Sequence, residues 1–134
     1  MVTPKNINFL IIDDYYSIRK AVKLTLRNLG YTGEIIEADS ITRARDLLAI
    51  KDCENKISFI ISDLQMPEGS GIDFLKTVRS HPQIKNMPFL ILSGVNEKQQ
   101  ILQAISNGVS GYLFKPWDDE TMGKRIDACW LKHA

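Results

Sequence analysis

Three aspartates, one serine and one lysine lie at the ends of short apolar runs in the sequence. Asp13 and Asp14 follow the first run, and Asp63 follows the third. Ser93 ends the fourth run, and Lys115 comes directly after the fifth. Carboxylates can bind a hard divalent cation or act as nucleophiles, while a hydroxyl and an ammonium group can stabilise a transferring phosphoryl group. These residue types predict phosphoryl-transfer chemistry if the fold brings them together.

The charge of this set favours a bound cation. Two carboxylates about 5 Å apart repel each other by about 3 kcal/mol at an effective dielectric constant of 20. Lys115 neutralises one of three negative charges and leaves the site negative. Because the ligands are all oxygens, we expect Mg²⁺, or Mn²⁺ in its place, held by Asp13 and Asp14. Asp63 is the expected nucleophile, because it stands alone at its strand end with the flexible loop 65–71 behind it.

Each of these residues also has an ordinary structural explanation. An aspartate after a strand often caps a helix or forms a turn, so Asp13 and Asp14 could serve the first helix. A lone serine is unremarkable, and a lone lysine is usually solvated. The placement of all five at four strand ends is what favours a functional site.

The elements that would position these residues alternate along the chain. Five short apolar runs, rich in Ile, Leu and Phe, predict strands at 7–12, 34–38, 57–62, 88–92 and 111–114. Three of these runs are nearly continuous, which is typical of strands buried on both faces of a parallel sheet. Amphipathic segments separate or follow the runs and predict five helices. The expected fold is therefore a doubly wound α/β sheet, in which all strand carboxyl ends lie along one edge.

Capping residues predict where the helices begin and end. Ser17 is expected to cap the first helix, and Gly30 is expected to end it. Ser40 precedes the second amphipathic stretch. Asn107 and Gly108 would end the fourth helix, and the acidic residues 118–120 would open the fifth.

Composition bounds the class of protein. A chain of 134 residues predicts one domain spanning residues 1–134. Hydrophobic residues make up 44% and charged residues 25%, which excludes a disordered chain. The formal net charge of +1 points neither to nucleic acid nor to a membrane surface. Without a secretory signal or a run of about 20 apolar residues, we expect a cytoplasmic protein in which Cys53 and Cys129 are reduced.

Four ordered motifs together resemble a known family. They are residues 12–14 (Ile-Asp-Asp), 63–67 (Asp-Leu-Gln-Met-Pro, with glycines at 69 and 71), 92–94 (Leu-Ser-Gly) and 111–116 (Gly-Tyr-Leu-Phe-Lys-Pro). Their order and spacing resemble the receiver (CheY-like) domain of two-component response regulators over essentially the whole chain. The resemblance implies a flavodoxin-like, five-stranded parallel sheet of order 2-1-3-4-5 with five helices.

The same resemblance implies roles for the metal-site residues. Asp63 would be the phosphoacceptor and also a metal ligand. Asp14 would bind Mg²⁺ directly, Asp13 through water, and Gln65 through its backbone carbonyl.

The resemblance also implies roles for residues near the phosphoryl group. Ser93 and Lys115 would contact that group, and Tyr112 would be the switch aromatic. A cis peptide bond would precede Pro116. Ser93 replaces the commoner threonine, and Gln65 and Val95 occupy two positions that vary within the family.

The partners follow from the resemblance as well. A histidine kinase or a phosphotransfer protein would phosphorylate the chain, and hydrolysis would reverse the change. The fourth helix, fifth strand and fifth helix would form a face read by a downstream protein or an output domain, with no direct contact to nucleic acid. A dimer that forms on phosphorylation is compatible with this scheme. The chain would then be a signalling protein rather than an enzyme, either standing alone or as part of a longer protein.

Two other functions remain open from the sequence. A phosphatase of the haloacid dehalogenase type also uses an aspartate nucleophile, but it needs a second aspartate two residues later as a general acid. Gln65 occupies that position and cannot donate the proton. A degenerate receiver that acts only as a binding module would have lost part of the five-residue set, whereas the set is intact here.

Overall fold

The computed structural model describes residues 3–49, 57–67, 69–94 and 96–133. Its main sheet is parallel throughout, in the order β2-β1-β3-β6-β7. These strands are β1 (Asn8–Ile12), β2 (Ile35–Ala38), β3 (Ile57–Asp63), β6 (Phe89–Ser93) and β7 (Gly111–Phe114). Counted along the chain, this is the order 2-1-3-4-5, which confirms the expected flavodoxin-like fold.

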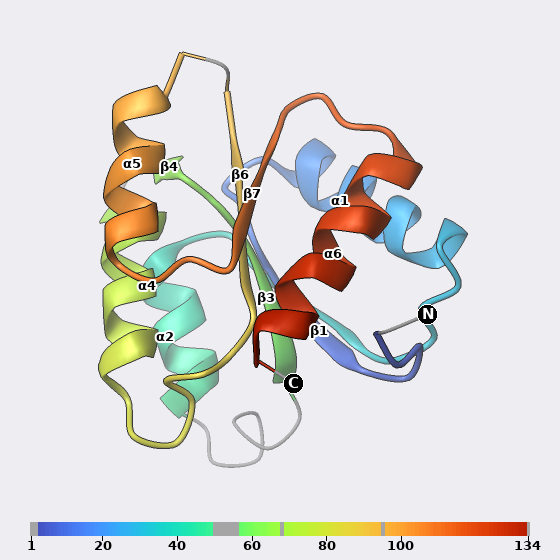
Figure 1. Ribbon diagram of the computed structural model, residues 1–134, viewed down its shortest axis with the longest axis horizontal. Coiled ribbons are helices and arrows are strands. Elements are labelled where there is room, and N and C mark those ends of the chain that lie inside the picture. The colour runs from blue at the N-terminus through green and yellow to red at the C-terminus, as the bar shows by residue number, and fades with distance from the viewer. Residues whose placement is uncertain (1–2, 50–56, 68, 95, 134) are drawn as a thin grey trace.

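Helices cover both faces of the sheet (Figure 1). The described residues form α1 (Tyr16–Asn28), α2 (Ile41–Ala49), α4 (Gly71–Ser80), α5 (Lys98–Ser106) and α6 (Asp119–His133). Helices α1 and α6 lie on one face, and α2, α4 and α5 lie on the other (Figure 1). The five helices expected from the amphipathic segments are therefore present.

Alternate residues of the central strands enter two separate cores. In β1, Leu10 and Ile12 belong to the core under α2, α4 and α5, while Phe9 and Ile11 belong to the core under α1 and α6. All four side chains are at most 1% exposed. Burial on both faces explains why this strand reads as a continuous apolar run rather than an alternating one.

The helix ends follow the expected signals with one exception. Ser40 Oγ accepts a hydrogen bond from Arg43 N at 3.0 Å, and Asp118 Oδ1 accepts one from Thr121 N at 2.7 Å. Gly30 follows α1 with a φ of 92°, a conformation that glycine adopts without strain.

The predicted cap at Ser17 is wrong. Helix α1 begins at Tyr16, one residue before Ser17, and Tyr15 at the cap position makes no side-chain capping bond. The Tyr15 N–H instead donates to Asp13 Oδ1 at 2.9 Å. Asp13 thus forms the turn that starts the helix, which removes the need for a serine cap.

The segment after Asp63 is more regular than the expected flexible loop. It contains a short antiparallel pair, β4 (Gln65–Met66) with β5 (Gly69–Ser70). Gly71 N donates to Leu64 O at 2.8 Å, and a Cβ on Gly71 would lie 2.3 Å from the backbone oxygen of Asp63. The hairpin returns the chain so tightly against β3 that only glycine fits at this position.

Of the two cysteines, the structure describes only Cys129. Cys129 is fully buried with a free thiol, and burial raises its pKa to about 12. Cys53 lies outside the described residues, so the reduced state of the pair stays a prediction.

A network of polar side chains lies at the amino end of β6 and β7, opposite to the end that carries the acids. Ser110 Oγ accepts hydrogen bonds from Phe89 N at 3.0 Å and from Arg79 Nη2 at 3.2 Å. Both lone pairs of the hydroxyl are then used, so its proton donates to His133 Nε2, which lies 2.7 Å away. This arrangement requires a neutral His133 with its proton on Nδ1.

Acid should weaken this network. Burial lowers the pKa of His133, and the charges of Arg79 and Lys132 lower it further. The unfolded chain therefore binds the proton more readily, so the stability contributed by His133 is full above about pH 6.5 and falls as pH drops through the lowered pKa. We expect His133→Gln to flatten this part of the pH profile of unfolding by urea, and an unchanged profile would contradict the assignment.

Candidate functional site

Three carboxylates meet at the carboxyl edge of the sheet. One carboxylate oxygen from each of Asp13, Asp14 and Asp63 lies within 4.8 Å of the other two. Strands β1 and β3 are adjacent, with Ile12 paired to Ser62, so their ends deliver these residues to one place. The predicted convergence of the acids is confirmed.

Lys115 reaches the same cluster from the end of β7. Its Nζ lies 2.9 Å from Asp63 Oδ1 and 3.4 Å from Asp13 Oδ2. Its backbone N–H donates to Ser93 O at 2.8 Å, which fixes the start of the side chain beside β6. The peptide bond between Lys115 and Pro116 is cis, as expected. One ammonium group thus bridges two of the three acids.

The carboxylates and the ammonium group shift one another's protonation. Burial raises the pKa of Asp63; the hydrogen bond from Lys115 opposes that shift, and the charge of Asp13 adds to it. Burial also raises the pKa of Asp13. For Lys115, burial opposes the charged form, but the carboxylates of Asp63 and Asp13 outweigh it and raise the pKa. Three acids and one lysine leave a strongly negative pocket that a cation would stabilise.

The donor set fits a magnesium ion. Within the part of the chain that the structure describes, Asp14 Oδ1 is buried and has no hydrogen-bond partner. Two oxygens on opposite sides of Mg²⁺ are about 4.2 Å apart, so acids within 4.8 Å of one another can share an ion with small rotations or a bridging water. An oxygen-only cluster of this kind is typical of the Mg²⁺ site in receiver domains.

Ser93 ends β6 beside this cluster. Its side chain is fully buried, and among the described residues its Oγ has no hydrogen-bond partner. Strand β6 pairs with β3 so that Leu92 lies opposite Asp63. A buried hydroxyl without a partner costs about 1–3 kcal/mol. The contact of Ser93 with a phosphoryl group stays a prediction.

Two further residues have predicted roles at the site or in its signal. Gln65 begins β4 with an exposed side chain, and the role of its carbonyl as a metal ligand stays a prediction. Tyr112 is half-buried in β7, with the Phe114 ring and the Arg125 guanidinium each 5.7 Å from its own ring. Its role as a switch also stays a prediction. Val95 lies outside the described residues.

Sequence reasoning missed the support given by Arg19. Its Nη1 donates to Asp13 O at 2.8 Å, and its Nε donates to Glu37 Oε1 at 3.0 Å. The guanidinium thereby ties α1 and β2 to the peptide that joins Asp13 to Asp14. The only sequence signal is a basic residue about one turn into the helix that follows the acids.

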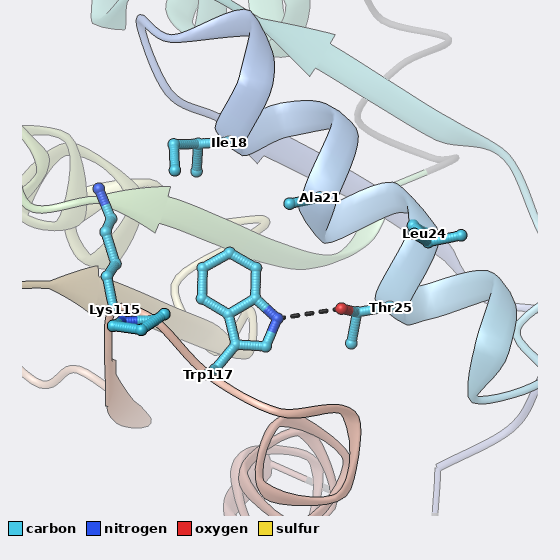
Figure 2. A pocket seen from close by; sticks show the side chains of 7 residues that line it. Ile18, Ala21, Leu24, Thr25, Lys115 and Trp117 are labelled. Atoms are coloured by element: carbon cyan, nitrogen blue, oxygen red, sulfur yellow. Dashed lines mark hydrogen bonds between the residues drawn. The ribbon is translucent and has the colours of Figure 1, made fainter.

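A second missed contact involves Trp117, in the segment between β7 and α6. Its ring packs against the core under α1 and α6, and its Nε1 also donates to Thr25 Oγ1 at 3.0 Å. Trp117 and Lys115 line one groove of about 480 Å³ against α1 (Figure 2).

Curated relatives match nearly the whole chain. It is 35% identical over 123 residues to the chemotaxis protein CheY-3 of Vibrio cholerae, covering 92% of this chain and 91% of that protein. It is 34% identical over 118 residues to the chemotaxis protein CheY of Pseudomonas aeruginosa, covering 88% and 91%.

Solved structures agree. The chemotaxis response regulator CheY4 of Vibrio cholerae superposes with a TM-score of 0.79 at 31% identity, covering 92% of this chain and 98% of that one. A response regulator receiver domain protein from Clostridium thermocellum gives a TM-score of 0.81 at 26% identity, covering 94% and 95%.

The helices in the described part of the chain are too short or too polar to cross a bilayer.

The family profile of the response regulator receiver domain matches residues 9–127. That family consists of signalling domains rather than conventional enzymes, and its phosphoacceptor signalling implies a histidine kinase as partner. The chain belongs to the receiver domain family of response regulators.

Proposed function

We propose that this chain accepts a phosphoryl group on Asp63 from a histidine kinase or a phosphotransfer protein, with Mg²⁺ bound, and loses it by hydrolysis. The observation that carries the proposal is the contact of Lys115 Nζ with Asp63 Oδ1 at 2.9 Å inside a cluster of three acids. The ion, when bound by Asp13, Asp14, Asp63 and the Gln65 carbonyl, supplies positive charge that offsets the charge of the phosphoryl oxygens.

Of the two acids that contact Lys115, Asp63 is the better nucleophile. Asp13 is 1% exposed, and each of its oxygens already accepts a hydrogen bond, from Tyr15 N and from Lys115. Asp63 accepts from Lys115 and from Leu64 N, and both bonds go to Oδ1. Neither bond engages Oδ2, so this oxygen is the one proposed to attack phosphorus.

The transfer balances without any further reactant. Asp63 Oδ2 forms a bond to phosphorus as the phosphorus–nitrogen bond of the donor phosphohistidine breaks, and the leaving imidazole keeps the electron pair and takes up a proton. Lys115 neutralises charge on the phosphoryl oxygens, and Ser93 Oγ donates a hydrogen bond to one of them. The group is lost in a separate step, in which water attacks phosphorus, the bond from phosphorus to Asp63 Oδ2 breaks, and inorganic phosphate, a proton and the free carboxylate are released.

The signal is proposed to leave through the face formed by α5, β7 and α6. Phosphorylation adds roughly 1.5 to 2 negative charges and three acceptor oxygens. Ser93 moves toward the new acceptor and away from its buried position at the end of β6. A downstream protein or an output domain then binds one arrangement of this face better than the other, which is all that a shift in population requires.

Tyr112 should report this change. We expect its ring to turn inward, into the space that Ser93 vacates, and to lose its contact with Arg125. Crystal structures with and without Mg²⁺ and beryllofluoride, a phosphoryl mimic, would compare the two side-chain conformations. The fully packed Tyr31, 2% exposed, serves as the tyrosine that should not move. An identical half-buried Tyr112 in both structures would remove it as a switch.

Labelling of the intact chain tests the proposed function. With acetyl phosphate and Mg²⁺, we expect the mass to rise by one phosphoryl group, and we expect no rise when a chelator removes the metal. Turnover of a chromogenic phosphate ester would instead favour a phosphatase. Failure to bind Mg²⁺ would favour a binding module without phosphorylation.

A further inference from the structure

We propose that the hydrogen bond between Trp117 and Thr25 positions Lys115 for phosphoryl transfer. The inference rests on the function proposed above and adds two positioning residues to it. Trp117 lies two residues after Lys115 in the segment that joins β7 to α6, and Thr25 lies on α1.

The bond joins two elements that are far apart in the sequence. Trp117 Nε1 donates to Thr25 Oγ1 at 3.0 Å across 92 positions, as the dashed line in Figure 2 shows. Thr25 is only 5% exposed, so its side chain has little access to water. Breaking this bond would leave a buried acceptor without a partner, which costs free energy, so the bond holds the indole at a defined distance and direction from α1. Phenylalanine at position 117 would keep a smaller aromatic ring but could not donate this bond.

The lysine stem borders the groove beside the tethered indole. Ile18, Ala21 and Leu24 of α1 line one side of this groove of about 480 Å³, and Lys115, Pro116 and Trp117 line the other. Figure 2 shows the Lys115 stem and the indole extending from the same segment, with α1 alongside. The groove gives the stem room to move, so its lateral position depends on where the segment is held.

Two anchors therefore hold the backbone segment around Lys115, in addition to the contacts that its ammonium group makes with Asp63 and Asp13. On one side, its backbone N–H is bound to Ser93 O at 2.8 Å. On the other side, the indole two residues later is bound to α1. The stem between backbone and ammonium group is flexible, so it does not fix the Nζ position by itself. A displacement of about 1 Å at a reacting group can cost about 10²-fold in rate. Loss of the anchor at Trp117 should therefore slow phosphoryl transfer.

A purely structural role for this bond makes a different prediction. If the bond only stabilised the fold, its loss would lower the free energy of unfolding and leave the chemistry of the folded chain unchanged. If it acts through Lys115, its loss slows phosphoryl transfer only while Lys115 is present. The two roles separate in a chain that lacks the lysine.

Two variants remove the bond, one from each side. Thr25→Val removes the acceptor, and Trp117→Phe removes the donor. With acetyl phosphate at saturating Mg²⁺, we expect each variant to be phosphorylated about 3- to 10-fold more slowly. The double variant should be no slower than the slower single variant, because both remove the same bond. Trp130→Phe, a similar change at a residue outside the groove lining, should keep the rate of the unaltered chain.

The same substitutions in a Lys115→Ala chain decide the role. We expect Thr25→Val and Trp117→Phe to have no further effect on the rate there, and we expect the dissociation constant for Mg²⁺ to stay within about twofold of its value in the matching background. An equal slowing with and without the lysine would overturn the proposal, and so would single variants as fast as the unaltered chain.

A readout that needs no phosphorylation keeps this test separate from the proposed function. The ¹³Cε resonance of Lys115 in the metal-free chain should shift in Thr25→Val toward the position of an unpaired lysine. If the unaltered chain takes up no phosphoryl group at all, the proposed function fails, and the resonance alone then tests whether the bond from Trp117 to Thr25 positions Lys115. An unshifted resonance in both Thr25→Val and Trp117→Phe would overturn this positioning role.

Discussion

Asp63→Asn is expected to take up no phosphoryl group from acetyl phosphate or phosphoramidate with Mg²⁺, a loss of at least about 10³-fold in labelling rate. The amide has no carboxylate oxygen to attack phosphorus. The amide of the variant keeps a carbonyl oxygen, which can still accept the hydrogen bond that Leu64 N donates to Asp63 Oδ1 at 2.9 Å. Burial and the charge of Asp13 disfavour the ionised form of Asp63, so the metal-free variant should be at least as stable as the unaltered chain.

The control for this substitution is Asp73→Asn. Asp73 is an exposed residue in the first turn of α4, away from the acidic cluster. We expect its variant to be labelled at the normal rate, and mass spectrometry of the intact chains measures both. Normal labelling of Asp63→Asn would defeat the assignment of the phosphoacceptor.

Lys115→Ala should separate metal binding from phosphoryl transfer. Its ammonium group contacts both Asp63 and Asp13, so its removal should tighten Mg²⁺ binding by at least about tenfold, or 1.4 kcal/mol. Phosphorylation at saturating Mg²⁺ should nevertheless slow by about 10²- to 10³-fold, because a charged donor to the transferring group is lost. The variant should fold yet transmit poorly to a downstream partner.

Lys124→Ala is the matched control for the loss of a lysine. Lys124 pairs with Glu120 on the exposed face of α6, where both side chains are more than three-quarters exposed. Its removal should change neither quantity measurably. Calorimetry with Mg²⁺ and stopped-flow phosphorylation provide the two numbers. Weaker metal binding in Lys115→Ala, or unchanged transfer, would contradict the role assigned to this residue.

The sequence predicted the parts of the fold that depend on periodicity. Phe9 and Leu10 stand next to each other in an apolar run and enter opposite cores, as expected of a strand buried on both faces. Once the strands are parallel, Asp13 and Asp63 must emerge at the same edge. The convergence of these acids therefore follows from the topology of the sheet alone.

The remaining features depend on contacts that no local pattern encodes. Asp13 accepts a hydrogen bond from Tyr15 N and forms the turn before α1, so this helix begins one residue before Ser17, its expected cap. The β4–β5 hairpin has two residues per strand, too few for an alternating pattern. The bond from Trp117 to Thr25 joins elements whose relative position is set only by the packed fold.

The central claim is that Asp63 carries the phosphoryl group, and reduction of the labelled chain with borohydride tests it most directly. Borohydride cleaves an acyl phosphate and converts the aspartate that carried it to homoserine, which peptide mass spectrometry locates. We predict homoserine at position 63, only after treatment with both acetyl phosphate and Mg²⁺. Homoserine at position 13 or 14, or a phosphorylated chain in which Asp63 survives reduction, would contradict the account.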